Sequence, residues 1–152
     1  MKIITWGTRG SMPVSGPDKV KYGGNTTCVQ IQSPCIPSDM VLAFDAGTGL
    51  VPCSAQYAGS RPILSILQTH SHWDHVFGLI SAPHAFMDGR YLHLYGPGEN
   101  GDGPERDLKD LFERRHFPVV FDQIAHRVIC KPVRNPSAQV FVVHPKAGIH
   151  LL

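Results

Sequence analysis

Alternating apolar and polar residues predict several short strands in this chain. Residues 26–32 alternate regularly, as a strand with one buried face does. Residues 63–68 are almost continuously apolar, which is typical of a strand covered on both faces. We expect strands at residues 2–6, 26–32, 40–45, 63–68, 91–95, 124–130 and 139–144. The prolines and serines between the second and third of these segments predict a turn, and hence a hairpin.

Three segments have the pattern of a helix instead. Leu50–Tyr57 is expected to be a short helix with Pro52 in its first turn, where proline is tolerated. A second helix is expected to begin near Asp74 and run through Ile80. Residues 105–115 give the clearest pattern, with acidic residues in the first turn and apolar residues on one face. Strands mixed with a few helices indicate an α/β fold with a largely antiparallel or mixed sheet, and 152 residues predict a single domain.

The composition excludes several classes of protein. Fourteen basic and twelve acidic residues leave a net charge of +2, which is too balanced for binding nucleic acid through a basic surface. No apolar run approaches the roughly 20 residues that cross a membrane, and the polar residues soon after Met1 do not resemble a secretory leader. The four cysteines form no C-x-x-C pair, so free thiols and a cytoplasmic location are expected. Nine histidines, in contrast, give the chain an unusual capacity to bind metal.

The segment 69–75 reads Thr-His-Ser-His-Trp-Asp-His and directly follows an expected strand. His70 and His72 are two residues apart, so at the extended end of a strand both side chains leave the same face and can reach one ion at about 2.0–2.1 Å. Asp74 and His75 follow where the chain should turn into a helix, and they can supply an oxygen and a nitrogen to a second ion. Composition alone can bring histidines together, but it does not explain the aspartate embedded among them. The residue types and their spacing therefore predict a metal site.

This histidine motif resembles that of the metallo-β-lactamase-fold metallohydrolases. The similarity is closer to a phosphodiesterase-like branch that includes ribonuclease Z and the cyclic phosphodiesterases of phosphonate pathways. Besides the histidines, the resemblance rests on residues 7–11, 22–28, 44–49, 78–79, 95–97 and 117–119, and it covers residues 2–133. It implies an αββα sandwich, in which two sheets pack back to back with helices outside. Residues 1–152 would then form the first half of one such domain and the start of its second half.

The resemblance also implies roles for individual residues. His70 and His72 would bind one zinc ion together with a later histidine, for which His144 before a proline is the best candidate. Asp74 and His75 would bind a second ion, and a water between the ions would attack the substrate, with Asp74 also handling the proton of this water. Manganese or iron could replace zinc, because the ligand set is not exclusive to zinc.

Three of the candidate residues have a second interpretation that the sequence leaves open. The resemblance implies that Asp45 supports the histidine loop, but Asp45 could also be a turn residue held by its own backbone. Asn25 could donate a hydrogen bond to a substrate phosphate, or it could close an Asx turn. His144 could be a metal ligand or an exposed residue at the end of a strand. The glycine-rich loops could let the backbone approach a substrate, or they could serve tight turns alone.

The chain departs from the family pattern after His144. The metal-bridging aspartate and the final histidine of the family are expected there, but no acidic residue follows Asp122 and the sequence ends at Leu152. We therefore expect a fold truncated after its first half, with an exposed apolar sheet face that self-association covers. The predicted function is a metal-dependent hydrolase of a small-molecule or nucleotide phosphodiester. The alternative is a catalytically inactive metal-binding or assembly module in which His70, His72 and His144 hold one ion.

Overall fold

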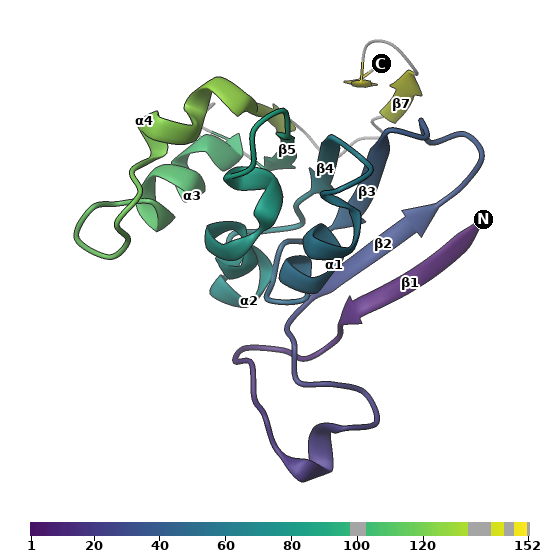
Figure 1. Cartoon of the computed structure of the whole chain (residues 1–152), viewed down its shortest axis with the longest axis vertical. Helices are drawn as coiled ribbons and strands as arrows, with labels where there is room; N and C mark the ends of the chain where they lie inside the picture. Colours follow the sequence, from purple (N-terminus) through teal and green to yellow (C-terminus); the bar gives the residue numbers. More distant parts are fainter. Residues whose placement is uncertain (98–102, 134–140, 145–147, 152) are drawn as a thin grey trace.

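A six-stranded mixed sheet organises the structure, which is a computed structural model (Figure 1). The structure describes residues 1–97, 103–133, 141–144 and 148–151, and the last two segments are described as backbone only. The strands of the sheet lie side by side in chain order and are β1 (Lys2–Gly7), β2 (Cys28–Gln32), β3 (Met40–Phe44), β4 (Ile63–Leu67), β5 (Tyr91–Pro97) and β6 (Val128–Val133). β1, β2 and β3 pair antiparallel, whereas β3, β4, β5 and β6 are parallel. The expected α/β class with a mixed sheet is therefore confirmed.

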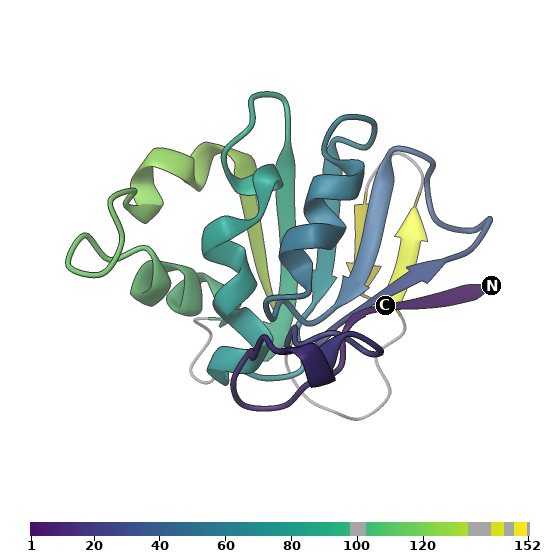
Figure 2. The same cartoon turned by 60° about the horizontal axis from the view of Figure 1, so that its bottom comes forward.

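The helices connect the parallel strands and cover one face of the sheet (Figure 2). They are α1 (Leu50–Tyr57), α2 (Trp73–Val76), α3 (Gly103–Leu111) and α4 (Phe121–Ile124). Adjacent parallel strands are almost always joined by right-handed crossovers, and a series of such crossovers in one direction places every helix on the same side. No helix in the described part of the chain is long and apolar enough to cross a membrane.

The hydrophobic core lies between these helices and the sheet. Leu64, Leu92 and Val41 occupy neighbouring positions on this face of the sheet and are completely or almost completely buried. α1 contributes Leu50 and Cys53 to the same cluster, and both are fully buried. This core fixes the positions of the strand ends, and the loops that follow those ends carry the candidate residues.

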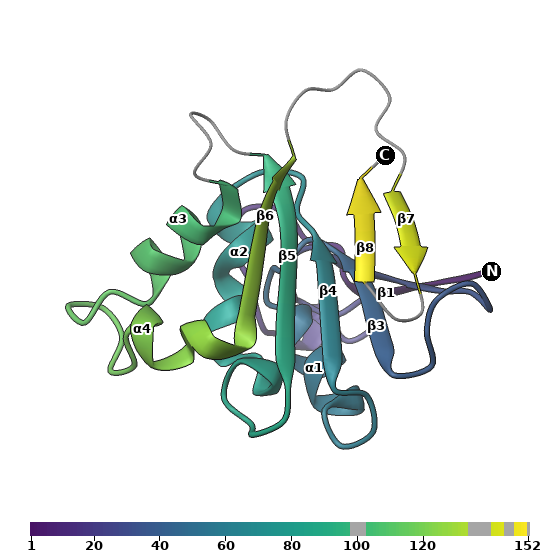
Figure 3. The same ribbon diagram turned by 90° about the horizontal axis from the view of Figure 1, so that it is seen from above.

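No helix of the described residues covers the opposite face of the sheet. Successive side chains of a strand point to opposite faces, so the register places Ile3, Phe44, Tyr91 and Ile129 together on this second face. Each of these four large apolar residues is at least 38% exposed. A small antiparallel hairpin of β7 (Phe141–His144) and β8 (Gly148–Leu151) lies on the same side, away from α1 (Figures 2 and 3). The centre of this face is buried, where Leu42 and Tyr95 form a second apolar cluster and are 7% and 3% exposed. That self-association covers the exposed side chains stays a prediction.

Most expected elements are found, but several boundaries were wrong, three of them by four residues or more. α3 ends at Leu111 rather than at residue 115, because the Glu113 carbonyl accepts the amides of His116 and Phe117 in a separate turn. The helix expected through Ile80 is only four residues of α2 followed by a 3-10 helix. β6 begins at residue 128 rather than 124, because the preceding residues form α4 and a 3-10 turn.

Candidate metal centre

The histidine loop lies at the carboxyl edge of the parallel strands. β3 and β4 are adjacent and parallel, so the segments that follow them meet at one edge of the sheet. Asp45 directly follows β3, and its amide donates to the carbonyl of Leu67 at the end of β4, at 3.1 Å. Residues 69–75 follow β4 and lead into α2. Two loops that are far apart in sequence are therefore joined at the candidate site.

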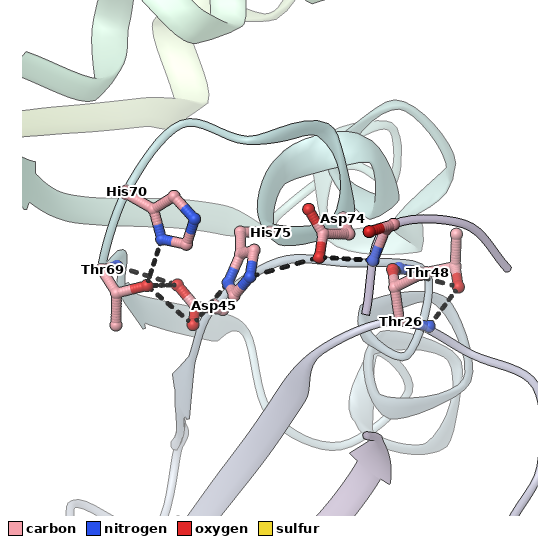
Figure 4. A network of polar contacts seen from close by, with 8 residues as sticks. Thr26, Asp45, Thr48, Thr69, His70, Asp74 and His75 are labelled. Atoms are coloured by element: carbon pink, nitrogen blue, oxygen red, sulfur yellow. Dashed lines mark hydrogen bonds and ion pairs between the residues drawn. The ribbon is translucent and has the colours of Figure 1, made fainter. Parts of the chain in front are cut away.

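The imidazoles of this loop lie close together, and Figure 4 shows two of them, those of His70 and His75. The ring centroids of His70 and His72 are 4.5 Å apart, and those of His70 and His75 are 4.0 Å apart. His72 is exposed, whereas His70 and His75 are half-buried. The contact between His70 and His72 is what a two-residue spacing at the end of a strand should give. The arrangement places three nitrogen-donor side chains in one open cluster.

The Asp45 carboxylate connects the two loops (Figure 4). Its Oδ1 accepts the Thr69 amide at 2.8 Å, and the Thr69 hydroxyl lies 2.9 and 3.0 Å from its two oxygens. Its Oδ2 lies 2.9 Å from Nδ1 of His75, although the ring is not aligned for a hydrogen bond. Asp45 is 4% exposed and has a φ of 58°, a conformation that costs energy outside glycine. These contacts favour support of the histidine loop over a turn held by its own backbone.

Asp74 is held from the opposite side by the loop after β1. The backbone amide of Ser11 donates to Oδ2 of Asp74 at 2.8 Å, and the same oxygen lies 3.4 Å from Nε2 of His75. The hydrogen bond from Ser11 is the main reason that the pKa of Asp74 lies below its ordinary value, and the nearby His75 and His72 lower this pKa further. Asp74 is therefore stabilised as a carboxylate, the form that binds a cation.

Two glycines allow these loops to pack directly against each other. A Cβ atom on Gly47 would lie 2.1 Å from the carbonyl oxygen of Asp74, and one on Gly78 would lie 2.1 Å from the carbonyl oxygen of Gly47. The amide of Ala46 also donates to the carbonyl of His75 at 2.7 Å. At Gly47 and Gly78, glycine is thus required by close approach within the protein itself.

α3 borders the histidine loop on its other side. Asp107 accepts hydrogen bonds from the Ser71 hydroxyl at 2.7 Å and from the Gln68 amide at 2.5 Å. Beside these residues is a pocket of about 300 Å³ whose apolar lining includes Trp73 and Leu111. Its polar lining comes from Ser71, Asp107, Asp110, Glu113 and His116. A hollow therefore adjoins the loop that carries the candidate ligands.

For the remaining candidates, Asn25 and His144, the structure does not test the predicted role. Oδ1 of Asn25 accepts the Thr48 hydroxyl at 3.2 Å, and Thr48 in turn is paired with Thr26 through two hydrogen bonds from backbone amides. Asn25 thus belongs to the network that carries the loop after β3, and its predicted contact with a substrate stays a prediction. His144 ends β7, but its side chain lies outside the described residues.

Thr69 and Ser11 are the contact residues that the sequence did not single out for any role. Both lie in segments that carry the family resemblance, but the contacts themselves depend on tertiary structure. Ser11 meets Asp74 across 63 positions of sequence. Thr69 precedes the first histidine, and its hydroxyl contacts both Asp45 and Nδ1 of His70. The Thr-His sequence is the single local feature from which a role for Thr69 could have been inferred.

The donor set fits a metal ion in chemistry, although its atoms do not converge as they stand. Within the described residues, no three His, Cys, Asp or Glu side chains are arranged to hold an ion. His75, however, has a carboxylate beside each ring nitrogen, Asp45 at Nδ1 and Asp74 at Nε2. A neutral imidazole carries one N–H, so a proton or a metal ion is needed beside the other nitrogen. Zinc accepts the same imidazole and carboxylate donors.

Comparison with known proteins adds no assignment. No protein-family model matches this chain, and no curated protein matches its sequence.

Proposed function

We propose that this chain binds one or two transition-metal ions, zinc first, through His70, His72, Asp74 and His75. The observation that carries the proposal is the cluster of three imidazoles beside a stabilised carboxylate at the carboxyl edge of a parallel sheet. The sheet with its one layer of helices is proposed to be the first half of a metallo-β-lactamase-type αββα sandwich. Manganese or iron could occupy the same nitrogen and oxygen donors.

The reaction that this site supports best is metal-dependent hydrolysis of a phosphodiester. A bound ion would lower the pKa of a coordinated water and offset the charge that develops on phosphorus. Asp74 would accept the proton of this water, and Ser11 would hold the Asp74 carboxylate in place through its amide. Asp45 lies beside Nδ1 of His75, and a small rotation of this ring on metal binding would let Nδ1 donate to it. His144 would complete the ligands of the first ion, and Asn25 would donate to a substrate phosphate.

The pocket between the histidine loop and α3 favours a small substrate. It adjoins the candidate ligands through Ser71 and Trp73, so a group bound there would lie next to the ions. Three carboxylates, those of Asp107, Asp110 and Glu113, line it. This negative charge would repel a long polyanion. A small-molecule or nucleotide phosphodiester carries fewer negative charges than a nucleic acid and is repelled less by these carboxylates.

A second candidate function is a metal-binding or assembly module without catalysis. It is favoured by the close contact of the His70 and His72 rings, whose centroids are 4.5 Å apart, because a single ion needs this pair and only one further donor. In this case His70, His72 and His144 would hold one ion with structural consequences alone.

The two functions are separated by measuring metal content and turnover on the same sample. The chain is loaded with zinc, dialysed and analysed for bound metal, and then assayed with a chromogenic phosphodiester. The hydrolase predicts bound zinc, measurable turnover and loss of turnover in His72→Ala. His126→Ala is the matched control, because His126 is an exposed histidine in the turn before β6. Saturating zinc without turnover would establish the module, and the absence of bound zinc would overturn both functions.

A further inference from the structure

The Thr69 hydroxyl lies between a carboxylate and an imidazole (Figure 4). Its oxygen is 2.9 Å from Oδ1 of Asp45, 3.0 Å from Oδ2 of Asp45 and 3.0 Å from Nδ1 of His70. The Thr69 amide separately donates to Oδ1 of Asp45 at 2.8 Å. The side chain and the backbone of one residue thus contact the same carboxylate.

The number of protons available determines which group donates in each of these hydrogen bonds. A carboxylate accepts only, so the single hydroxyl proton of Thr69 points to Asp45. The hydroxyl oxygen then has lone pairs but no proton for His70, so Nδ1 of His70 must be the donor. A neutral imidazole with its proton on Nδ1 leaves Nε2 bare, and a bare ring nitrogen is what a metal ion requires.

We propose that Thr69 is a positioning residue that sets the tautomer and ring orientation of His70. Its hydroxyl links the Asp45 carboxylate to Nδ1 of His70, and we call this chain of two hydrogen bonds the relay. The relay's part in metal binding rests on the proposed function, whereas the tautomer itself does not. Asp45 already lies 2.9 Å from Nδ1 of His75. One buried carboxylate therefore lies beside two imidazoles, next to Nδ1 of His75 and linked to Nδ1 of His70 through the Thr69 hydroxyl.

The relay is expected to increase metal affinity. A ligating histidine that donates its second N–H to a fixed acceptor is held in the binding orientation before the ion arrives, and loss of such a partner typically weakens binding about 10–100-fold. His72 makes no such contact with Asp45 or Thr69 among the interactions described, and it is exposed. Its ring provides an internal comparison within the same loop.

Thr69→Val tests the relay with little other disturbance. Valine has nearly the shape of threonine, and it keeps the backbone amide that donates to Asp45. Thr69 is exposed, so the substitution opens no cavity in the core. Thr69→Ser is the matched control, because it changes the side chain but retains the hydroxyl.

Two measurements are made on the wild type and both variants. The first is a ¹H–¹⁵N correlation spectrum of the imidazoles in the metal-free protein at pH 8, which reports the tautomer of each ring. The second is zinc affinity, measured by competition with a chromogenic chelator. We expect the Nδ1–H tautomer at His70 in the wild type and in Thr69→Ser, and a shift toward Nε2–H in Thr69→Val. Zinc affinity should fall about tenfold in Thr69→Val and recover in Thr69→Ser, with the His72 tautomer unchanged.

The tautomer measurement and the zinc affinity test the relay and the proposed function independently. If wild-type His70 carries its proton on Nε2, or if Thr69→Val leaves its tautomer unchanged, the relay is wrong even when zinc binds. If the tautomer shifts while zinc affinity stays the same, the relay has no part in metal positioning. If the wild type binds no zinc, the proposed function fails, and the spectrum still decides whether Thr69 sets the tautomer.

Discussion

His84 is a polar residue that the fold buries completely and satisfies on both sides of its ring. Its Nε2 donates to the carbonyl of Arg61 at 2.8 Å, and its Nδ1 accepts the Ser54 hydroxyl at 2.7 Å. Burial lowers the pKa of His84 below its ordinary value, the hydrogen bond to Arg61 opposes this shift, and the charge of Arg90 adds to it. The residue is therefore held neutral in the native state.

This lowered pKa predicts a loss of stability as the pH falls. The unfolded chain takes up a proton at His84 near its usual pKa of about 6.5, before the folded chain does. The unfolded state then binds more protons, so the free energy of unfolding decreases as the pH falls below this value, by at most about 1.4 kcal/mol per pH unit for one group.

We expect His84→Gln to reduce this pH dependence. Its free energy of unfolding at pH 7.5 should be lower than that of the wild type by about 2 kcal/mol, because buried hydrogen bonds are lost. Between pH 7.5 and pH 5 it should change less steeply. Urea unfolding at several pH values measures both quantities. Because the other histidines are common to both proteins, the difference in slope belongs to His84, and identical slopes would contradict its burial as a neutral ring.

At the level of elements, the sequence predicted what local periodicity controls. The contact of His70 with His72 follows from the alternation of a strand end, and α1 was expected at its observed bounds. The end of α3 could not be predicted, because a turn at Glu113 competes with a sequence that otherwise favours a longer helix. The contact between Ser11 and Asp74 depends on the path of the whole β1–β2 loop, which no local pattern encodes.

Gly78 provides a test of how tightly the 3-10 helix after α2 packs against the loop after β3. In Gly78→Ala the new Cβ would lie 2.1 Å from the Gly47 carbonyl oxygen, and a backbone atom cannot rotate away. Overpacking of this kind costs about 3 kcal/mol. Because the same loop carries Asp45, we also expect weaker zinc binding.

Gly59→Ala is the control for this prediction. A Cβ on Gly59 meets no atom within 4 Å, so its free energy of unfolding should stay within about 0.5 kcal/mol of the wild type. Urea unfolding of both variants measures the difference. Equal stability of Gly78→Ala and Gly59→Ala would show that the 3-10 helix after α2 and the loop after β3 are not in close contact.

For the whole molecule, the face of the sheet without helices raises the question of what covers it. Ile3, Phe44, Tyr91 and Ile129 lie on this face and are partly exposed, and they come from strands across the whole sheet. The centre of this face is buried, because Leu42 and Tyr95 are only 7% and 3% exposed, so the exposed apolar side chains lie around a covered centre. Exposed apolar side chains of this kind are candidates for an interface. A second copy presents the same exposed side chains. We therefore expect a two-fold dimer that buries the exposed apolar side chains of this face in both chains.

Ile129→Lys should weaken this dimer. The substitution places a charge on the second face of β6, where dimerisation would remove it from water without a partner. Sedimentation velocity over a range of concentrations should show a dimer for the wild type and mainly a monomer for Ile129→Lys. The dissociation constant of the dimer should rise at least about tenfold, which corresponds to about 1.4 kcal/mol. Val20→Lys is the control, because Val20 is 82% exposed in the loop between β1 and β2 and is not part of the sheet. A wild type that stays monomeric at high concentration, or a dimer that Val20→Lys disrupts and Ile129→Lys does not, would show that the second face is not the interface.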